Sequence, residues 1–323
     1  MRRIGRVGLL LAVLGLLPAA SVPAARAAGE AIAPARIVMI TWRGETDAER
    51  AFRDALNAGP RPVSIRMAHA GQNTAVLAAI IDHIQAAPPD LIYVFGTTAT
   101  KAVLARIHDI PVVFNIVNRP VAAGVIASWK RSGNNATGVS NQVPMDDQLL
   151  ALKKIIDFRR LGIVYNPNEQ NSRIQVDIAR RLEERFGFTV SGFPITGTAD
   201  IPVILPGLQG QVDAVFFLGD SLIISLGAAI MERVNHYRLP SLAVVDSMVV
   251  DDGVLLGLTT DFSELGRMAA EKARRILDGE APGDIPSSVM DYYRITVNMT
   301  TARTIGVQIP ISLLVITNRI IRN

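Results

Sequence analysis

Polar residues that follow short apolar runs are the most informative feature of this sequence. In the segment LGIVYNPNEQNS, residues 161–172, an apolar run breaks at Asn166-Pro167 and passes through polar residues into an amphipathic stretch. This order predicts a strand, a turn and a helix that begins near Asn171-Ser172. The first N–H groups of a helix lack backbone acceptors, so the segment could bind an anion. The alternative is that Asn171 or Ser172 only caps the helix.

Polar residues also follow other apolar runs, and together they could bind a small molecule. Hydroxyl and amide groups could donate to a carboxylate, and Asp220 or Asp246 could accept from an ammonium group. We slightly prefer Asp246, because it directly follows the apolar run LAVV. Trp42 is the best candidate for an apolar wall. Alternatively, each aspartate caps a helix and Trp42 anchors an exposed loop. The predicted ligand-binding residues are Thr41, Trp42, Thr97, Thr98, Asn118, Asn166, Glu169, Asn171, Ser172, Asp220, Ser221, Asp246 and Ser247.

Alternating strands and helices must position these residues. The apolar runs ARIVMI, LIYVF and PVVFNIV predict strands that are buried on both faces of a parallel sheet, with amphipathic helices between them. The same pattern restarts near Gly162, so the chain contains two similar halves. Ligands of open parallel sheets bind beyond the carboxyl ends of the strands. The predicted fold class is therefore α/β, with two doubly wound parallel-sheet lobes and a ligand cleft between them.

Three local expectations complete this picture. Residues 133–144 are rich in Gly, Asn, Ser and Thr and have no helical period, which indicates the first crossing between lobes. A short helix is expected from Ala99, after the polar residues Gly96 to Thr98. The final strand is expected over residues 292–297.

The first 28 residues have the features of a secretory signal peptide. Three arginines precede the apolar run of residues 7–17, and small residues, interrupted by a fourth arginine at 26, follow at 24–28. We expect cleavage after Ala28, with Ala25 or Ala27 as alternatives, and export to the periplasm. Removal of this segment lowers the count of Lys plus Arg from 33 to 29, which equals the 29 Asp plus Glu. The mature chain is then formally neutral, and its charge gives no argument for binding nucleic acid.

An enzyme is the alternative from a different functional class. Residues 219–222 spell Gly-Asp-Ser-Leu, the motif of GDSL serine hydrolases, in which Ser221 would be the nucleophile. That motif requires a later Asp-x-x-His, but the only downstream histidine is His236, with Arg233 at the aspartate position. A serine without a base is a poor nucleophile. We therefore expect no catalytic residue.

The sequence also gives no reason to expect a metal or a cofactor. It contains no cysteine, its four histidines are scattered, and phosphate-binding glycine motifs are absent. The lack of cysteine likewise excludes a disulfide and a lipidated N-terminal cysteine.

Several segments resemble the ABC-transporter substrate-binding proteins of the TrpX type, which bind tryptophan or tyrosine. The resemblance extends over nearly the whole chain after the first thirty or so residues. It rests on YNPNEQNS, on residues 111–144, on DAVFFLGDS and LAVVDS, on DFSELGRMAAEKARRILDGEAPGDIP and on TARTIGVQIPISLL.

This resemblance implies a type I periplasmic-binding fold that closes by a hinge motion on a small ligand. It implies a first lobe of residues 35–140 plus 262–285 and a second lobe of residues 141–261 plus 286–323. The implied partner is the membrane permease of an ABC importer, and the implied state is a monomer. An aromatic amino acid is the first candidate ligand, and a related carboxylate is the second. A periplasmic sensor that hands its closed form to a receptor is the alternative role.

The chain departs from the family pattern at three loops, which leaves the identity of the ligand open. These loops are TWRGETD, Asn118-Arg119-Pro120 and Asp261-Phe262-Ser263. Arg43 or Arg119 could pair with a ligand carboxylate or simply face water, and the latter is favoured for Arg119.

Overall fold

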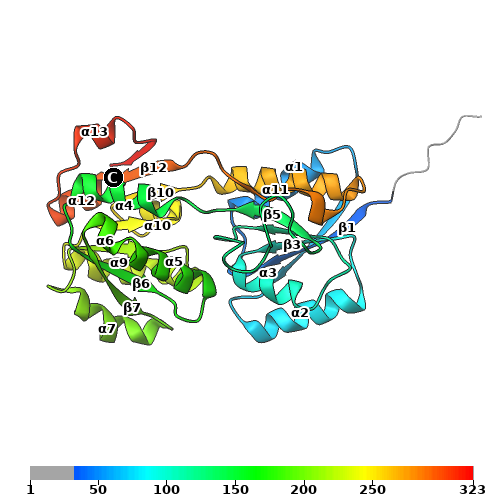
Figure 1. The fold of residues 1–323 in the computed structure, drawn as a ribbon, viewed down its shortest axis with the longest axis horizontal. Coiled ribbons are helices and arrows are strands. Elements are labelled where there is room, and N and C mark those ends of the chain that lie inside the picture. Colours follow the sequence, from blue (N-terminus) through cyan, green and yellow to red (C-terminus); the bar gives the residue numbers. More distant parts are fainter. Residues whose placement is uncertain (1–32, 323) are drawn as a thin grey trace, which may run out of the picture. The chain divides into compact units, whose positions relative to one another are not determined.

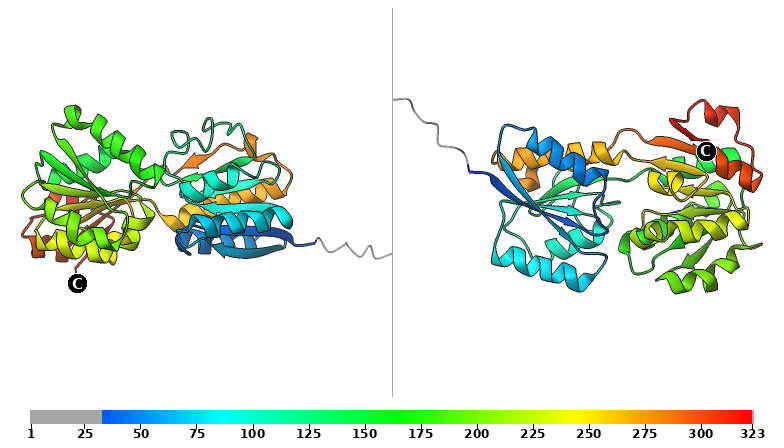
Figure 2. Two further views of the ribbon diagram at one scale, coloured as in Figure 1. Left: turned by 90° about the horizontal axis from the view of Figure 1, so that it is seen from below. Right: turned by 180° about the vertical axis from the view of Figure 1, so that it is seen from behind.

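The computed structural model describes residues 33–322, and the predicted signal peptide, residues 1–28, lies outside the described residues. The described chain forms two β-sheets with helices packed against both faces of each (Figures 1 and 2). Its hydrophobic core is correspondingly divided, with one buried cluster in the first lobe and three in the second. The predicted α/β class with two parallel-dominated lobes is confirmed.

The first sheet has six strands, all paired in parallel, in the order β11-β5-β4-β3-β1-β2. Its strands are β1 (Ala35–Thr41), β2 (Val63–His69), β3 (Leu91–Phe95), β4 (Val112–Asn115), β5 (Ala136–Ser140) and β11 (Ser288–Val289). The helices that accompany them are α1 (Asp47–Asn57), α2 (Thr74–Ala86), α3 (Thr97–Leu104) and α11 (Phe262–Leu277), with the 3₁₀ turn η3 (Pro282–Asp284). β1, β3, β4 and β5 are almost completely buried, as their apolar runs predict for the centre of a parallel sheet.

The second sheet has seven strands in the order β13-β12-β10-β9-β8-β6-β7, and only the β10–β12 pair is antiparallel. Its strands are β6 (Arg160–Tyr165), β7 (Thr189–Pro194), β8 (Ala214–Phe217), β9 (Ser241–Ala243), β10 (Leu256–Thr259), β12 (Arg294–Asn298) and β13 (Arg319–Ile321). Its helices are α4 (Met145–Ile155), α5 (Gln170–Arg181), α6 (Glu183–Phe186), α7 (Ile201–Ile204), α8 (Ser221–Ser225), α9 (Gly227–His236), α10 (Asp246–Val250), α12 (Met299–Ile305) and α13 (Ile311–Leu314), with 3₁₀ turns η1 (Thr198–Asp200) and η2 (Leu205–Leu208).

The chain passes between the two sheets after β5, after β10 and after β11. Residues 133–144, expected as a crossing, contain the buried strand β5, so only the part after Ser140 leads to the second lobe. Alternation of apolar residues is weak in ATGVS, and the strand is held by non-local contacts such as the bond from Thr137 Oγ1 to the Ile285 carbonyl, 2.9 Å. The expected helix at Ala99 begins two residues earlier, at Thr97.

The last crossing is fixed by a buried lysine. Lys272 on α11 donates to the Pro286 carbonyl at 2.6 Å and to Ser288 Oγ at 2.8 Å, which holds β11 against the first lobe. Two residues of the segment expected in the second lobe, Ser288 and Val289, therefore pair with the first sheet. Burial lowers the pKa of Lys272 to about 8.

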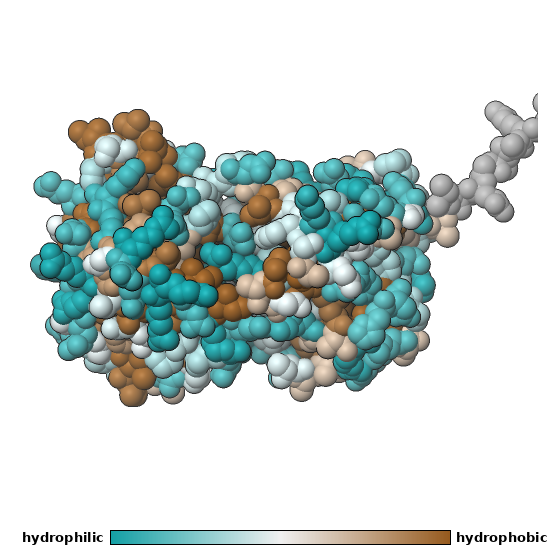
Figure 3. Space-filling view, viewed as in Figure 1, coloured by the Kyte–Doolittle hydropathy of each residue, from teal (hydrophilic) through white to brown (hydrophobic). Residues whose placement is uncertain are grey.

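The face of the described residues shown in Figure 3 is mostly polar, with hydrophobic side chains gathered over α13. Ile311 and Val315, in and after this helix, are each 78% exposed. Within residues 33–322, every helix is too short or too polar to cross a membrane.

Candidate ligand-binding site

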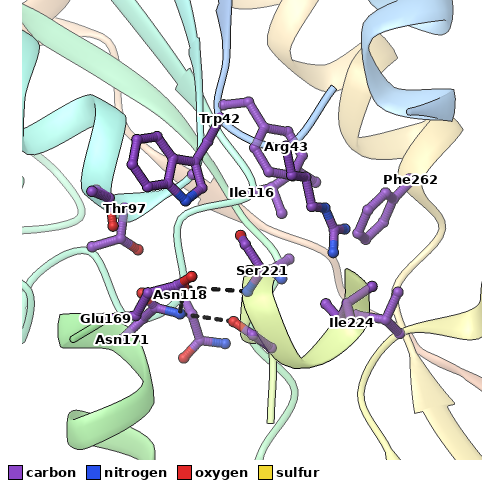
Figure 4. Close-up of a pocket in the computed structure, with 16 residues that line it drawn as sticks. Trp42, Arg43, Thr97, Ile116, Asn118, Glu169, Asn171, Ser221, Ile224 and Phe262 are labelled. Carbon is purple, nitrogen blue, oxygen red and sulfur yellow. Dashed lines mark hydrogen bonds between the residues drawn. The ribbon is translucent and has the colours of Figure 1, made fainter. Parts of the chain in front are cut away.

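A pocket lies where strand ends of both sheets face each other (Figure 4). Its hollow has a volume of about 410 Å³, which includes the space that is open to solvent. The residues that line it are Trp42, Arg43, Phe95, Gly96, Thr97, Thr98, Ile116, Asn118, Asn141, Glu169, Asn171, Gly219, Ser221, Ile224, Val245 and Phe262. The pocket thus lies at the carboxyl ends of the parallel strands, where the sequence predicts it.

The first-lobe wall is rich in donors. Arg43 follows β1, and its guanidinium lies 5.3 Å from the ring centroid of Phe95 and 6.0 Å from that of Phe262. Among the described residues, no carboxylate lies within salt-bridge distance of Arg43. Burial lowers its pKa, and the negative charges of Glu49, Glu169 and Asp220 oppose this shift. A ligand carboxylate could therefore pair with this cation.

The N-terminus of α3 adds further donors to this wall. Gly96 is the N-cap residue, and its φ of 83° favours glycine; it provides no side-chain cap. Thr97 and Thr98 follow it directly and line the pocket. The backbone N–H groups of the first turn consequently have no capping side chain to satisfy them.

The second-lobe wall contributes a carboxylate. Glu169 is the N-cap residue of α5 and is only 6% exposed. Its Oε2 accepts from the backbone N–H of Ser221 at 3.2 Å and from Asn171 Nδ2 at 3.4 Å. Asn171 Nδ2 also donates to the Gly219 carbonyl at 2.7 Å. Burial, and then the charge of Asp220, raise the pKa of Glu169 to about 7.

Asp220 lies behind this wall and is completely buried. Its carboxylate accepts hydrogen bonds from three donors within the protein. Its carboxylate accepts from the backbone N–H of Asn166 at 2.6 Å, from that of Ile223 at 3.0 Å and from Ser172 Oγ. Burial raises the pKa of Asp220, although these donors oppose the shift. Asp220 therefore holds the ends of β6 and β8 together and does not line the pocket.

The predicted site residues fall into four groups. Those that line the pocket are Trp42, Thr97, Thr98, Asn118, Glu169, Asn171 and Ser221. Asn166, Ser172 and Asp220 form the hydrogen-bond network behind it. Thr41 is buried and bonds to His69 Nδ1 at 2.6 Å through its hydroxyl. Asp246 and Ser247 line a neighbouring hollow instead.

The geometry does not favour Asp246 as the ammonium acceptor. Thr296 Oγ1 donates to its carboxylate at 2.8 Å, and Arg319 forms an ion pair with it at 3.0 Å. The neighbouring hollow, of about 1,020 Å³, shares only Arg43, Ile224, Val245 and Phe262 with the pocket. Glu169 is the one acidic residue among those lining the pocket itself.

Several lining residues were not among the predicted set. Phe95 ends a predicted strand, and Phe262 belongs to one of the loops that depart from the family pattern. The sequence therefore offered a reason to consider both residues. Asn141 had none, because it follows β5, which the sequence pattern did not reveal. Ile116 has a φ of 56°, rare for a β-branched residue, and its N–H bonds to Asn115 Oδ1 at 2.9 Å. Within residues 33–322, no cluster of three or more histidine or acidic side chains is placed to hold a metal.

Comparison with known proteins supports this architecture. Residues 49–321 match the family model described as ABC transporter substrate binding protein. The chain is 29% identical over 220 residues to the tyrosine-binding protein of Clostridioides difficile (strain R20291), a match that covers 68% of this chain and 64% of that protein, slightly less than two thirds.

Two solved structures are also similar. An ABC domain from Streptococcus pneumonia in complex with L-Trp gives a TM-score of 0.84 at 23% identity, covering 89% of this chain and all of that one. The ligand-free, open structure of a substrate-binding protein with adhesive properties from Clostridium difficile gives a TM-score of 0.66 at 25% identity. The match covers 89% of this chain and 99% of that one.

Proposed function

Because this chain belongs to the family of ABC transporter substrate-binding proteins, we propose that it is the exported solute-binding component of an importer, and that its ligand is an amino acid. One observation carries this proposal. The first lobe presents an unpaired guanidinium and an uncapped helix N-terminus to the pocket, and the second lobe presents a carboxylate. An α-amino acid carries the matching pair of opposite charges on two groups attached to the same carbon.

The ligand proposed first is an aromatic amino acid. Trp42, Phe95 and Phe262 line the pocket together with aliphatic residues, and these rings offer faces against which an aromatic side chain can pack. A related protein described as tyrosine-binding, and a similar structure described with L-Trp, support this choice. A related carboxylate is the second candidate.

In this proposal the ligand acts by stabilising the closed arrangement of the lobes, which the permease then recognises. One contact already joins the lobes beside the pocket: Lys101 Nζ on α3 donates to Gln170 Oε1 on α5 at 2.6 Å. We further propose that the protein is periplasmic, monomeric and not catalytic, with no cofactor. The predicted lobe boundaries belong to this proposal, except that Ser288 and Val289 of β11 belong to the first sheet.

Thermal unfolding tests the proposal directly. The purified protein is unfolded and refolded to remove carried-over ligand, then heated with single amino acids and aromatic carboxylates. A ligand present at a hundred times its dissociation constant adds about 2.7 kcal/mol to the free energy of unfolding, which raises the midpoint visibly. The expected result is a rise for L-tyrosine or L-tryptophan that Glu169→Gln removes. If no amino acid raises the midpoint, the assigned ligand class is wrong.

A further inference from the structure

The indole N–H of Trp42 is the most informative unpaired group in the pocket. Trp42 is 6% exposed, and no acceptor among the described residues lies within hydrogen-bonding distance of its buried Nε1. Indole is a donor only, and a buried donor without an acceptor is costly. In Figure 4 this nitrogen points into the pocket from the first lobe, as does the Arg43 guanidinium, and both face Ser221. Trp42 is therefore more than an apolar wall.

A second unpaired group complements the first. Asn141 lines the same pocket and is 7% exposed, and its Oδ1 accepts no hydrogen bond from the described residues. Its Nδ2 lies 3.9 Å from the position that a Cβ would take on Gly219. Gly219 in turn accepts from Asn171, so Asn141 belongs to the side of the pocket that carries Glu169. The Asn141 side chain, which carries the unpaired acceptor, thus lies beside the anionic side of the pocket, and the unpaired donor of Trp42 lies on the cationic side.

We propose that Trp42 Nε1 donates to the ligand carboxylate and that Asn141 Oδ1 accepts from the ligand ammonium group. This inference rests on the proposed function and adds two specificity-determining residues to it. Arg43 attracts the ligand carboxylate and Glu169 attracts the ligand ammonium group. The uncharged groups of Trp42 and Asn141 both find a hydrogen-bond partner only when the ligand carries both charges. A ligand that lacks one of them leaves one buried polar group unpaired, which a site of this kind rejects strongly.

The two tryptophans of the chain allow the donor role to be observed directly. In ¹⁵N-labelled protein, Trp42 and Trp129 give the two indole N–H signals expected from the sequence. Loss of one signal in Trp42→Phe assigns the two signals to their residues. Trp129→Phe is the control, because it makes the same substitution at a partly buried residue that does not line the pocket. With L-tryptophan or L-tyrosine, the Trp42 indole proton is expected to move downfield, as it does on donating to a carboxylate, while that of Trp129 stays in place.

Binding of ligand analogues separates the two roles. Trp42→Phe is expected to weaken L-tryptophan and indole-3-propionate about tenfold to a hundredfold and to leave tryptamine, which has no carboxylate, within about twofold. Asn141→Ala is expected to weaken L-tryptophan and tryptamine and to spare indole-3-propionate. The corresponding L-tyrosine series applies if that amino acid binds more tightly.

Three results would overturn the inference. The first is tight binding of the amino acid with no downfield shift of the Trp42 proton. The second is unchanged affinity in both variants, and the third is equal weakening of all three ligands, which indicates lost packing only. If no amino acid stabilises the wild-type protein, the proposed function itself has failed and this inference falls with it.

Discussion

Glu169 Oε2 accepts a hydrogen bond of 3.2 Å from the backbone N–H of Ser221, and this contact joins the loops that follow β6 and β8. The bond places a carboxylate at the pocket. The backbone of Ser221 makes this contact, and its hydroxyl does not take part in it. Burial raises the pKa of the same carboxyl, and the charge of Asp220, the neighbour of Ser221, raises it further. Residues 220–221 therefore both position Glu169 and add to the rise in its pKa that burial causes.

Ligand affinity should depend on pH through Glu169. An ammonium ligand favours the ionised carboxylate, and the pKa of Glu169 in the free protein is about 7. We expect the affinity to fall about tenfold between pH 8 and pH 6, because binding at the lower pH must first remove a proton. Isothermal titration calorimetry at several pH values measures this. Glu169→Gln should bind weakly with a flat profile, and a wild-type affinity that does not change with pH would contradict the assignment.

The same substitution should stabilise the free protein. Because the folded-state pKa of Glu169 is raised, the folded state holds more protons than the unfolded state between about pH 4.5 and pH 7, and stability falls as the pH rises through this window. At pH 8, Glu169→Gln should therefore raise the free energy of unfolding by up to about 3 kcal/mol. Chemical denaturation measures it, with the exposed Glu184→Gln as the control. If Glu169→Gln were less stable than wild type at pH 8, burial of the ionised carboxylate would not destabilise the folded state.

Asp220→Asn should change both stability and the pH profile. Three donors converge on the Asp220 carboxylate, and an amide cannot accept from all of them. We expect a loss of about 1–3 kcal/mol in the free energy of unfolding. Removal of the charge should also lower the pKa of Glu169, so the fall in affinity on acidification should move to lower pH. An unmoved profile in a folded variant would show that the two carboxyls are not coupled.

Arg43→Met should weaken amino-acid binding without unfolding the protein. Methionine retains apolar contact with Phe95 and Phe262 but cannot pair with a carboxylate. We expect a loss of about 2 kcal/mol in binding free energy, measured by calorimetry. Arg36→Met, at the opposite end of β1 and exposed, is the control and should bind like wild type. Equal affinity in both variants would mean that Arg43 does not meet the ligand.

Ser221→Ala should separate binding from hydrolysis. The backbone N–H of Ser221, which the substitution keeps, makes the contact to Glu169. We therefore expect folding to be unchanged and ligand affinity to change by less than about tenfold. We also expect wild type and variant to show the same background hydrolysis of p-nitrophenyl acetate. Ester turnover by wild type that the variant loses would instead support the serine hydrolase alternative.

Gly266→Ala should destabilise the first lobe. α1 and α11 pack closely there, and a Cβ on Gly266 would lie 2.2 Å from the Ala48 carbonyl oxygen. Because backbone must move to admit a methyl group, we expect a loss of about 1–3 kcal/mol or more in the free energy of unfolding. Gly197→Ala, where no atom lies within 4 Å of the new Cβ, should have little effect or stabilise slightly. Denaturant titration compares the two, and similar stabilities would contradict the close packing.

Much of the fold could be predicted from the sequence because its signals are local. The continuous apolar runs at β1, β3 and β4 became buried central strands, and the segment after β6 became the predicted turn and helix. β5 was missed because its five residues carry no strong pattern. It is a strand only because β4 and β11 pair with it on either side, and these partners lie far apart in the sequence.

The sequence by itself placed polar residues at the strand ends, and the tertiary structure decided which of them reach the pocket. Asp246 and Glu169 are both acidic residues after apolar strands, and no local pattern distinguishes them. Arg319, 73 residues away, pairs with Asp246, whereas Glu169 meets only neutral donors and is left facing the pocket. Strand and helix periods are set by neighbouring residues, but the partner of a charged group and its burial are set by segments that meet only on folding.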